Sequence, residues 1–119
     1  MYGRALRDQR IFGQAAQEFA RAAQMKPDSK EAWNELAGVL ILLEQYQPAL
    51  TALDKAKALG GETAAYYYFR AIVLDRLKDY KPALESYQKF LSMSQDKNPD
   101  EEFKARQRIR IIQKELSKR

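Results

Sequence analysis

A chain of 119 residues with 45% hydrophobic and 31% charged residues has the length and composition of a single globular domain. Its net charge of +5 is concentrated in residues 103–119, which hold seven basic residues against one acid, so the sequence disfavours nucleic acid as a partner. Histidine and cysteine are absent, which excludes the catalysis, disulfides and metal sites that need them, and the composition leaves the cellular compartment open.

The first element expected is an incomplete helical hairpin over residues 1–28. A displacement of 34 residues places Phe12 beneath Tyr46, so we expect a break before Phe12 and a second helix that ends near Pro27. The copy begins partway through its first helix, which leaves open whether the chain is a piece of a longer protein. Tyr2, Leu6 and Phe12 should then be partly uncovered, and weak homodimerisation through this edge is expected.

Two complete copies follow, over residues 30–63 and 64–97. In each copy apolar residues recur at helical spacing on both sides of a break, so each copy is expected to form two helices. Pro48 and Pro82 lie two residues after Tyr46 and Tyr80, and proline is tolerated only in the first turn of a helix. The second helix of each copy is therefore predicted to begin at the tyrosine.

The repeated positions carry a family resemblance. They are Trp33, Leu36, Ala37, Leu40, Tyr46, Ala49, Leu53 and Ala56 in the second copy, and Tyr67, Ala71, Leu74, Tyr80, Ala83 and Tyr87 in the third. This pattern resembles the tetratricopeptide repeat signature, over residues 1 to about 97. The resemblance implies an all-α fold, a right-handed superhelix of about three helical hairpins, in which the signature residues form the core.

The third copy departs from the signature at two positions. Arg70 stands where leucine is commoner, and Phe90 stands where the family prefers a small residue. The change at Phe90 indicates that the last hairpin packs against something other than a standard next repeat.

The last element expected is a helix over residues 99–119 that begins after Asn98. Acidic residues follow in its first turn, where the helix dipole favours them. The apolar residues that fall on one face are Ala105, Ile109, Ile112 and Leu116. We expect a capping helix that covers the open flank of the third copy.

No catalytic constellation is evident, so the chain is not expected to be an enzyme or to hold a cofactor or metal. Asp75 and Asp79 lie four residues apart and could suggest a pair of carboxylates. The neighbouring Arg76 and Lys78 favour ordinary solvated surface ion pairs instead.

The resemblance places the first helix of each hairpin on an inner, concave wall. Its inner-facing positions are Arg4, Arg7 and Asp8 in the first copy, Glu31, Asn34, Glu35, Gly38, Ile41 and Leu42 in the second, and Tyr68, Phe69, Ile72, Asp75 and Arg76 in the third. The signature leaves these positions free, yet several are apolar, which is typical of an interaction surface.

We therefore expect a non-catalytic scaffold or adaptor that binds a peptide or helix of another protein in its concave groove, and no small-molecule substrate. Two alternatives stay open. One is a regulatory repeat fragment of a larger enzyme or membrane protein. The other is a module that binds RNA or a membrane surface through the basic last helix.

Overall fold

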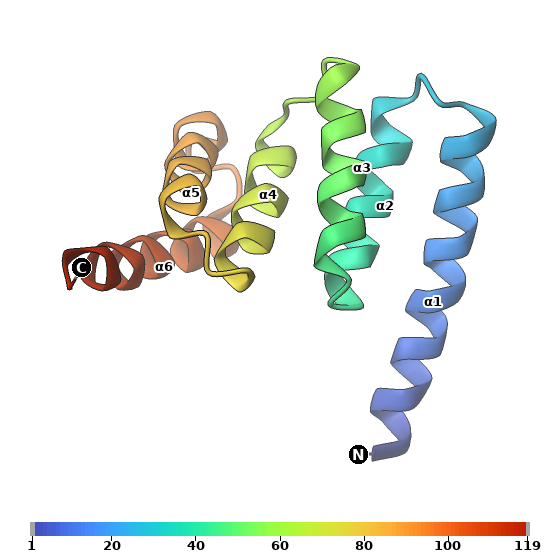
Figure 1. Ribbon diagram of the computed structural model, residues 1–119, viewed down its shortest axis with the longest axis horizontal. Helices are drawn as coiled ribbons and strands as arrows, with labels where there is room; N and C mark the ends of the chain where they lie inside the picture. The colour runs from blue at the N-terminus through green and yellow to red at the C-terminus, as the bar shows by residue number, and fades with distance from the viewer. Residues whose placement is uncertain (1, 119) are drawn as a thin grey trace. The chain divides into compact units, whose positions relative to one another are not determined.

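The computed structural model describes the backbone of residues 2–118 and the side chains of residues 11–118, and within this range the chain is all-α. Its helices are α1 (Tyr2–Met25), α2 (Lys30–Leu42), α3 (Tyr46–Ala58), α4 (Ala64–Arg76), α5 (Tyr80–Ser94) and α6 (Pro99–Ser117) (Figure 1). They form two compact units, residues 1–61 (unit 1) and residues 62–119 (unit 2). We describe each unit by itself.

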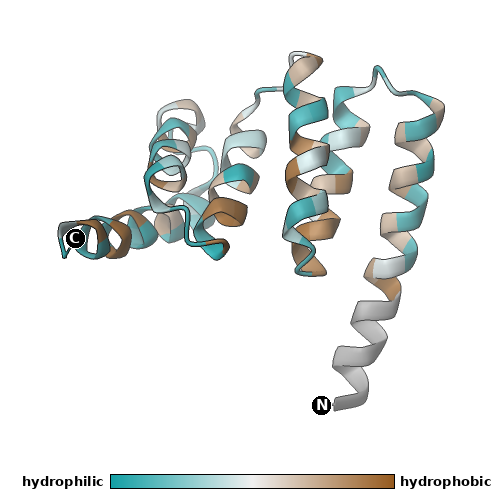
Figure 2. Cartoon of the chain, in the orientation of Figure 1, coloured by the Kyte–Doolittle hydropathy of each residue, from teal (hydrophilic) through white to brown (hydrophobic). Residues whose placement is uncertain are grey.

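Unit 1 consists of α1, α2 and α3, which lie side by side (Figure 1). Ala37 on α2 and Ala49 on α3 are fully buried, and their small side chains let the two backbones approach closely. Ala23 of α1 is also fully buried. Apolar and hydrophilic residues alternate along each helix (Figure 2), as expected of helices that bury one face.

The expected break before Phe12 is wrong, because α1 runs without interruption from Tyr2 to Met25. The corresponding breaks in the other copies are each followed by a proline, Pro48 or Pro82, whereas the first copy has Gln14 at that position. Glutamine is a good helix former, and without a proline at this position α1 continues even past Gly13. The first copy is thus a single long helix and not a hairpin.

The ends of α2 and α4 have the same backbone geometry. Glu44 and Lys78 adopt the left-handed conformation, with φ of 60° and 62°. One residue later, the N–H of Gln45 donates to the Leu40 carbonyl at 2.9 Å, and the N–H of Asp79 donates to the Leu74 carbonyl at 2.8 Å. These hydrogen bonds satisfy carbonyls that the helix leaves open, and they turn the chain into α3 and α5.

The starts of α3 and α5 are confirmed at Tyr46 and Tyr80, with Pro48 and Pro82 in the first turn. The end of α3 uses Gly60, at φ 79°, followed by a close backbone approach at Gly61. A Cβ at Gly61 would lie 2.9 Å from the Ala56 carbonyl oxygen and 2.9 Å from the Lys30 Cβ. Glycine is therefore required there.

Unit 2 contains the hairpin of α4 and α5. Two residues that contact each other across this hairpin both differ from the corresponding residues of the hairpin in unit 1. Leu36 and Ala52, which are buried in the second copy, correspond to Arg70 and Ser86 in the third. The Arg70 guanidinium donates to the buried Ser86 hydroxyl at 2.7 Å. The polar substitution on one helix is thereby matched by a polar partner on the other.

The predicted terminal helix is present as α6, which contacts α5 and runs crosswise to it (Figure 1). Ala105 and Ile112 are fully buried, and Ile109 and Leu116 are half-buried, so the predicted apolar face is the packed one. Phe90, the second departure from the signature, is buried against the ring of Tyr68, with 4.8 Å between centroids.

A buried carboxylate ties the start of α6 to the end of α5. Glu102 accepts hydrogen bonds from the Ser94 hydroxyl and from the Asn98 backbone N–H, the latter at 2.9 Å. The Asn98 side-chain amide donates to the same Ser94 oxygen at 3.0 Å. The hydrogen bonds to the carboxylate lower the pKa of Glu102 below its ordinary value, and the bond from Ser94 contributes most. Glu102 is therefore ionised, and its charge is stabilised by these donors.

Candidate functional site

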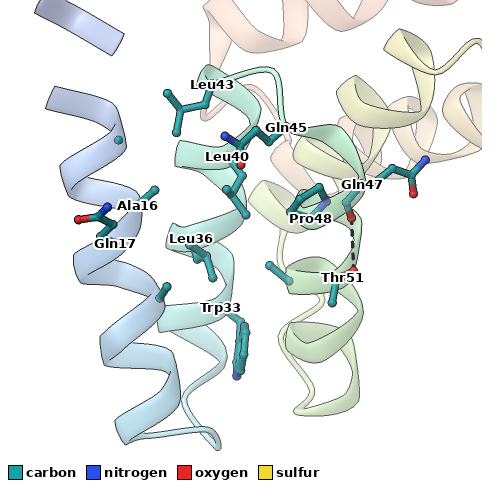
Figure 3. A pocket seen from close by; sticks show the side chains of 13 residues that line it. Ala16, Gln17, Trp33, Leu36, Leu40, Leu43, Gln45, Gln47, Pro48 and Thr51 are labelled. Carbon is teal, nitrogen blue, oxygen red and sulfur yellow. Dashed lines mark hydrogen bonds between the residues drawn. The ribbon is translucent and has the colours of Figure 1, made fainter. Parts of the chain in front are cut away.

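A groove in unit 1 runs between α1 and α3, with α2 as its floor (Figure 3). Its volume of about 840 Å³ is within the range of ligand sites in proteins. The lining residues are Gly13, Ala16, Gln17 and Ala20 from α1, Trp33, Leu36, Leu40 and Leu43 from α2 and its C-cap, and Gln45, Gln47, Pro48, Thr51 and Ala52 from the turn and α3.

The floor of the groove is apolar and fixed in place. Leu36 and Leu40 lie one helical turn apart, and each is only 8% exposed. Trp33 is half-buried, and its indole N–H donates to the Pro27 carbonyl at 2.9 Å. The Lys55 ammonium lies 5.9 Å from the ring centroid of Trp33, at cation–π distance. The indole is therefore held at the edge of the groove by two contacts.

The α1 wall is open because its residues are small. Gly13, Ala16 and Ala20 recur at a spacing that places them on one side of α1. A Cβ at Gly13 would find no heavy atom within 4 Å. Because these three positions of α1 carry no large side chain, part of the space between α1 and α3 is left unfilled.

The polar lining of the groove is uncharged. It consists of Gln17, Gln45, Gln47 and Thr51, whose side chains are exposed. The Thr51 hydroxyl donates to the Gln47 carbonyl at 3.3 Å, which leaves the hydroxyl oxygen able to accept. Among the described residues that line the groove, none has a charged side chain, although 31% of the chain is charged, so this part of the groove suits a neutral occupant.

Sequence reasoning missed this groove because it assigned Trp33, Leu36 and Leu40 to a closed core. Leu36 and Leu40 are buried as predicted, but they lie at the bottom of a groove. The signal that could have found it is the row of small residues, Gly13, Ala16 and Ala20, on the helix opposite them. A repeat signature specifies which residues face a neighbouring helix, but not how far away that helix lies.

Some of the predicted inner-facing side chains of α2 are exposed, whereas others pack or form hydrogen bonds within unit 1. Glu31, Glu35 and Leu42 are exposed, and Leu42 keeps 59% of its surface exposed. Ile41 is half-buried. The Asn34 amide donates to the Gly61 carbonyl at 3.3 Å, so it holds the turn after α3 and is engaged within unit 1. The side chains of Arg4, Arg7 and Asp8 lie outside the described residues.

The predicted residues of α4 are less open than expected. Tyr68, Phe69 and Ile72 are half-buried, and Arg76 is exposed. The ring of Tyr68 packs on Phe90 of α5, and burial raises the pKa of its hydroxyl. Tyr68 is thus partly a packing residue of unit 2.

Asp75 is a correction to the predicted surface. It is 9% exposed, and both carboxylate oxygens accept hydrogen bonds from Arg108 of α6, at 2.6 and 2.7 Å. The Tyr87 hydroxyl also donates to Asp75, at 3.0 Å. Its partner is Arg108 and not the neighbouring Arg76 or Lys78, so Asp75 is not available to a partner protein.

The described residues contain no cluster of acidic side chains that could hold a metal ion. Within the same range, no helix is long and apolar enough to cross a membrane. The described lining of the groove offers apolar surface and neutral hydrogen-bonding groups, which suit binding.

The family model of the tetratricopeptide repeat matches residues 6–73, more than half of the chain, and so covers all three helices of the groove and most of α4. The chain belongs to the tetratricopeptide repeat family. Members of this family are generally protein–protein interaction modules and typically non-catalytic scaffolds. No curated protein matches the chain. For this tetratricopeptide repeat protein, the groove and the free faces of α2 and α4 are the candidate binding surfaces.

Proposed function

We propose that this protein is a non-catalytic scaffold that holds a segment of another polypeptide in the groove of unit 1. The observation that carries the proposal is that the described lining between α1 and α3 is mainly apolar and that its polar side chains are uncharged. A charged side chain that enters this groove would lose hydration without an ionic partner among the described lining residues, whereas an apolar one would gain from leaving water. The bound segment is accordingly uncharged, with apolar side chains that reach Trp33, Leu36 and Leu40.

The neutral polar groups supply what an extended peptide backbone needs. A side-chain amide both donates and accepts, and so does a hydroxyl. Gln45 can therefore pair with N–H and C=O groups of a bound segment while side chains of the segment enter the groove. The Thr51 hydroxyl, whose proton is donated to the Gln47 carbonyl, can accept from an N–H. Aromatic side chains are frequent energetic centres of interfaces, which makes the half-buried Trp33 the residue expected to contribute most.

A second binding surface is favoured by the exposure of Leu42. Ile41 and Leu42 lie on α2 at positions that the repeat signature leaves free, flanked by the exposed acids Glu31 and Glu35. This face suits an amphipathic helix with basic residues beside its apolar stripe. The corresponding face of α4, with Phe69, Ile72 and Arg76, is the equivalent surface of unit 2.

Selection of peptides from a displayed random library on the immobilised protein tests the proposal. Peptides that bind should be uncharged and apolar at their centre, and their affinity is measured by isothermal titration calorimetry. Ala16→Glu introduces a charge on the groove wall and should weaken binding at least tenfold, because the carboxylate is desolvated by the peptide. Gln14→Glu, on the exposed surface of the same helix, is the matched control and should have no effect.

Leu42→Glu separates the two surfaces. If Leu42→Glu abolishes binding and Ala16→Glu does not, the bound segment lies on the free face of α2 and the groove is not the site. If neither substitution affects any selected peptide, both surfaces are rejected.

A further inference from the structure

The outward face of α6 carries two large apolar side chains that the packing of unit 2 does not use. Phe103 is 60% exposed and Ile111 is 50% exposed. Phe103 and Ile111 are eight positions apart, and two turns of an α-helix take about 7.2 residues. The two side chains therefore lie within about a quarter turn of each other around the helix. Apolar bands between hydrophilic ones are visible along α6 in Figure 2.

The same face is basic. Between residues 103 and 118, the exposed side chains include five basic residues and no acid, namely Lys104, Arg106, Arg110, Lys114 and Lys118. Arg106 and Lys118 have ion pairs of 3.5 Å with Glu102 and Glu115. Lys104, Arg110 and Lys114 have no ion pair among the described residues, so their charges face solvent uncompensated.

The opposite face of α6 is already committed to unit 2. Ala105 and Ile112 are fully buried, and Arg108 holds Asp75 of α4. The helix can therefore present Phe103 and Ile111 outward while it remains docked. Phe103 and Ile111, together with the basic side chains around them, form an amphipathic surface on the exposed side of the docked helix.

We propose that this outward face of α6 binds the surface of an anionic lipid bilayer. Phe103 and Ile111 enter the boundary between headgroups and acyl chains, and the basic side chains around them contact lipid phosphates. The outward side of a helix is convex. It can lie on a flat, deformable surface such as a bilayer and does not need a partner with a complementary groove. Single-stranded nucleic acid is the weaker match, because Phe103 is the one aromatic side chain exposed on the described α6 and Ile111 offers no second ring on which a base can stack.

Co-sedimentation of the full chain with vesicles tests this inference. The protein should bind vesicles that contain phosphatidylcholine and phosphatidylserine, fail to bind phosphatidylcholine alone, and dissociate as salt is raised. The double variant Phe103→Ala/Ile111→Ala should lower the partition coefficient on the order of tenfold, because it removes the apolar contact and leaves the charge unchanged. Its melting temperature should stay unchanged, since both side chains are exposed.

The charge contribution has a matched control. Lys104→Gln/Arg110→Gln/Lys114→Gln should lower the partition coefficient on the order of 100-fold. Lys26→Gln/Arg21→Gln/Lys57→Gln removes the same number of positive charges from exposed positions of unit 1 and should have little effect.

Tryptophan fluorescence reports whether the outward face of α6 enters the bilayer. Phe103→Trp should show a blue-shifted emission with anionic vesicles. The wild-type chain, in which Trp33 is the only tryptophan, should not show this shift.

Several results would overturn the proposal. They are equal binding to neutral and anionic vesicles, no binding to either, equal losses in the two charge variants, unchanged binding in the apolar double variant, and capture of single-stranded RNA but not of vesicles.

Discussion

Arg108 of α6 closes on Asp75 of α4 with two hydrogen bonds, Nε to Oδ2 at 2.6 Å and Nη2 to Oδ1 at 2.7 Å. This pairing joins the terminal helix to the hairpin before it, across 33 residues of sequence. The Asp75 side chain is 8% exposed and the Arg108 side chain 38% exposed. The Asp75 carboxylate is thus buried, and it depends on Arg108 to neutralise its charge. The Arg108 guanidinium keeps part of its hydration.

Arg108→Ala should destabilise unit 2, because it leaves the Asp75 carboxylate with only the Tyr87 hydroxyl among its observed hydrogen-bond donors. We expect a loss of about 2 kcal/mol, between the values for exposed and for buried ion pairs. Urea denaturation followed by circular dichroism measures it. Arg110→Ala, on the exposed face of the same helix, should change the free energy of unfolding by less than about 0.5 kcal/mol. Equal effects of the two substitutions would show that the ion pair contributes nothing.

Ile111 and Ile112 are adjacent and identical in chemistry, but their exposures are 50% and 0%. Ile112→Ala should cost about 3 kcal/mol, because it leaves a cavity under α6, whereas Ile111→Ala should cost less than about 0.5 kcal/mol. The measurement is thermal unfolding by circular dichroism. A small loss for Ile112→Ala would mean that α6 is not docked in solution.

The Glu102 carboxylate should make the stability of unit 2 sensitive to acid. Because its pKa is lowered in the folded state, the stabilisation is complete above the ordinary value of 4.5 and is lost as pH falls through the lowered one. Glu102→Gln keeps the size of the side chain and removes this titration. The difference in melting temperature between wild type and Glu102→Gln should be largest above about pH 5 and should shrink on acidification. A difference independent of pH would contradict the assignment.

Lys78→Gly should stabilise the protein, since Lys78 has a φ of 62°, where a Cβ is strained and glycine is not. We expect a gain of about 0.5 to 1 kcal/mol in urea denaturation. Lys78→Ala retains the Cβ and should bring no such gain. Glu44→Gly is the same change in unit 1, where Trp33 is the only tryptophan of the chain and reports unfolding by its fluorescence.

Weak self-association remains a prediction. Of the residues on which it rests, Phe12 is half-buried, and the side chains of Tyr2 and Leu6 lie outside the described residues. The neighbouring Ile11 is 50% exposed, which leaves apolar surface on α1. Sedimentation velocity at rising concentration should show a shift toward dimer, and Ile11→Lys should reduce it. A monomer at all concentrations would count against the prediction.

The sequence was most informative where a residue has a single tolerated conformation. Proline is confined to a first helical turn, and Pro48 and Pro82 correctly located the starts of α3 and α5. Where such a residue was lacking, at Gln14, similarity to the other copies misled, and the predicted break lies inside α1.

Relationships between distant residues could not be read from the repeat pattern. Asp75 occupies a position that the signature leaves free, so nothing local distinguished a surface acid from one buried under α6. Its partner, Arg108, is one of seven basic residues in the final segment. The groove was missed for a related reason, because its width depends on how closely α1 packs on its neighbours, which apolar spacing does not encode.

The pairing of Arg70 with Ser86 has a consequence for how such repeats can be exchanged. Each residue is acceptable only in the presence of the other, since a buried serine hydroxyl facing leucine, or an arginine facing alanine, would lack its hydrogen bond. The helix that carries Arg70 could not be transplanted into the second copy without the helix that carries Ser86. In this chain, the smallest interchangeable part is therefore the hairpin, and recombination within a hairpin would produce a mismatched interior even between sequences that both satisfy the signature.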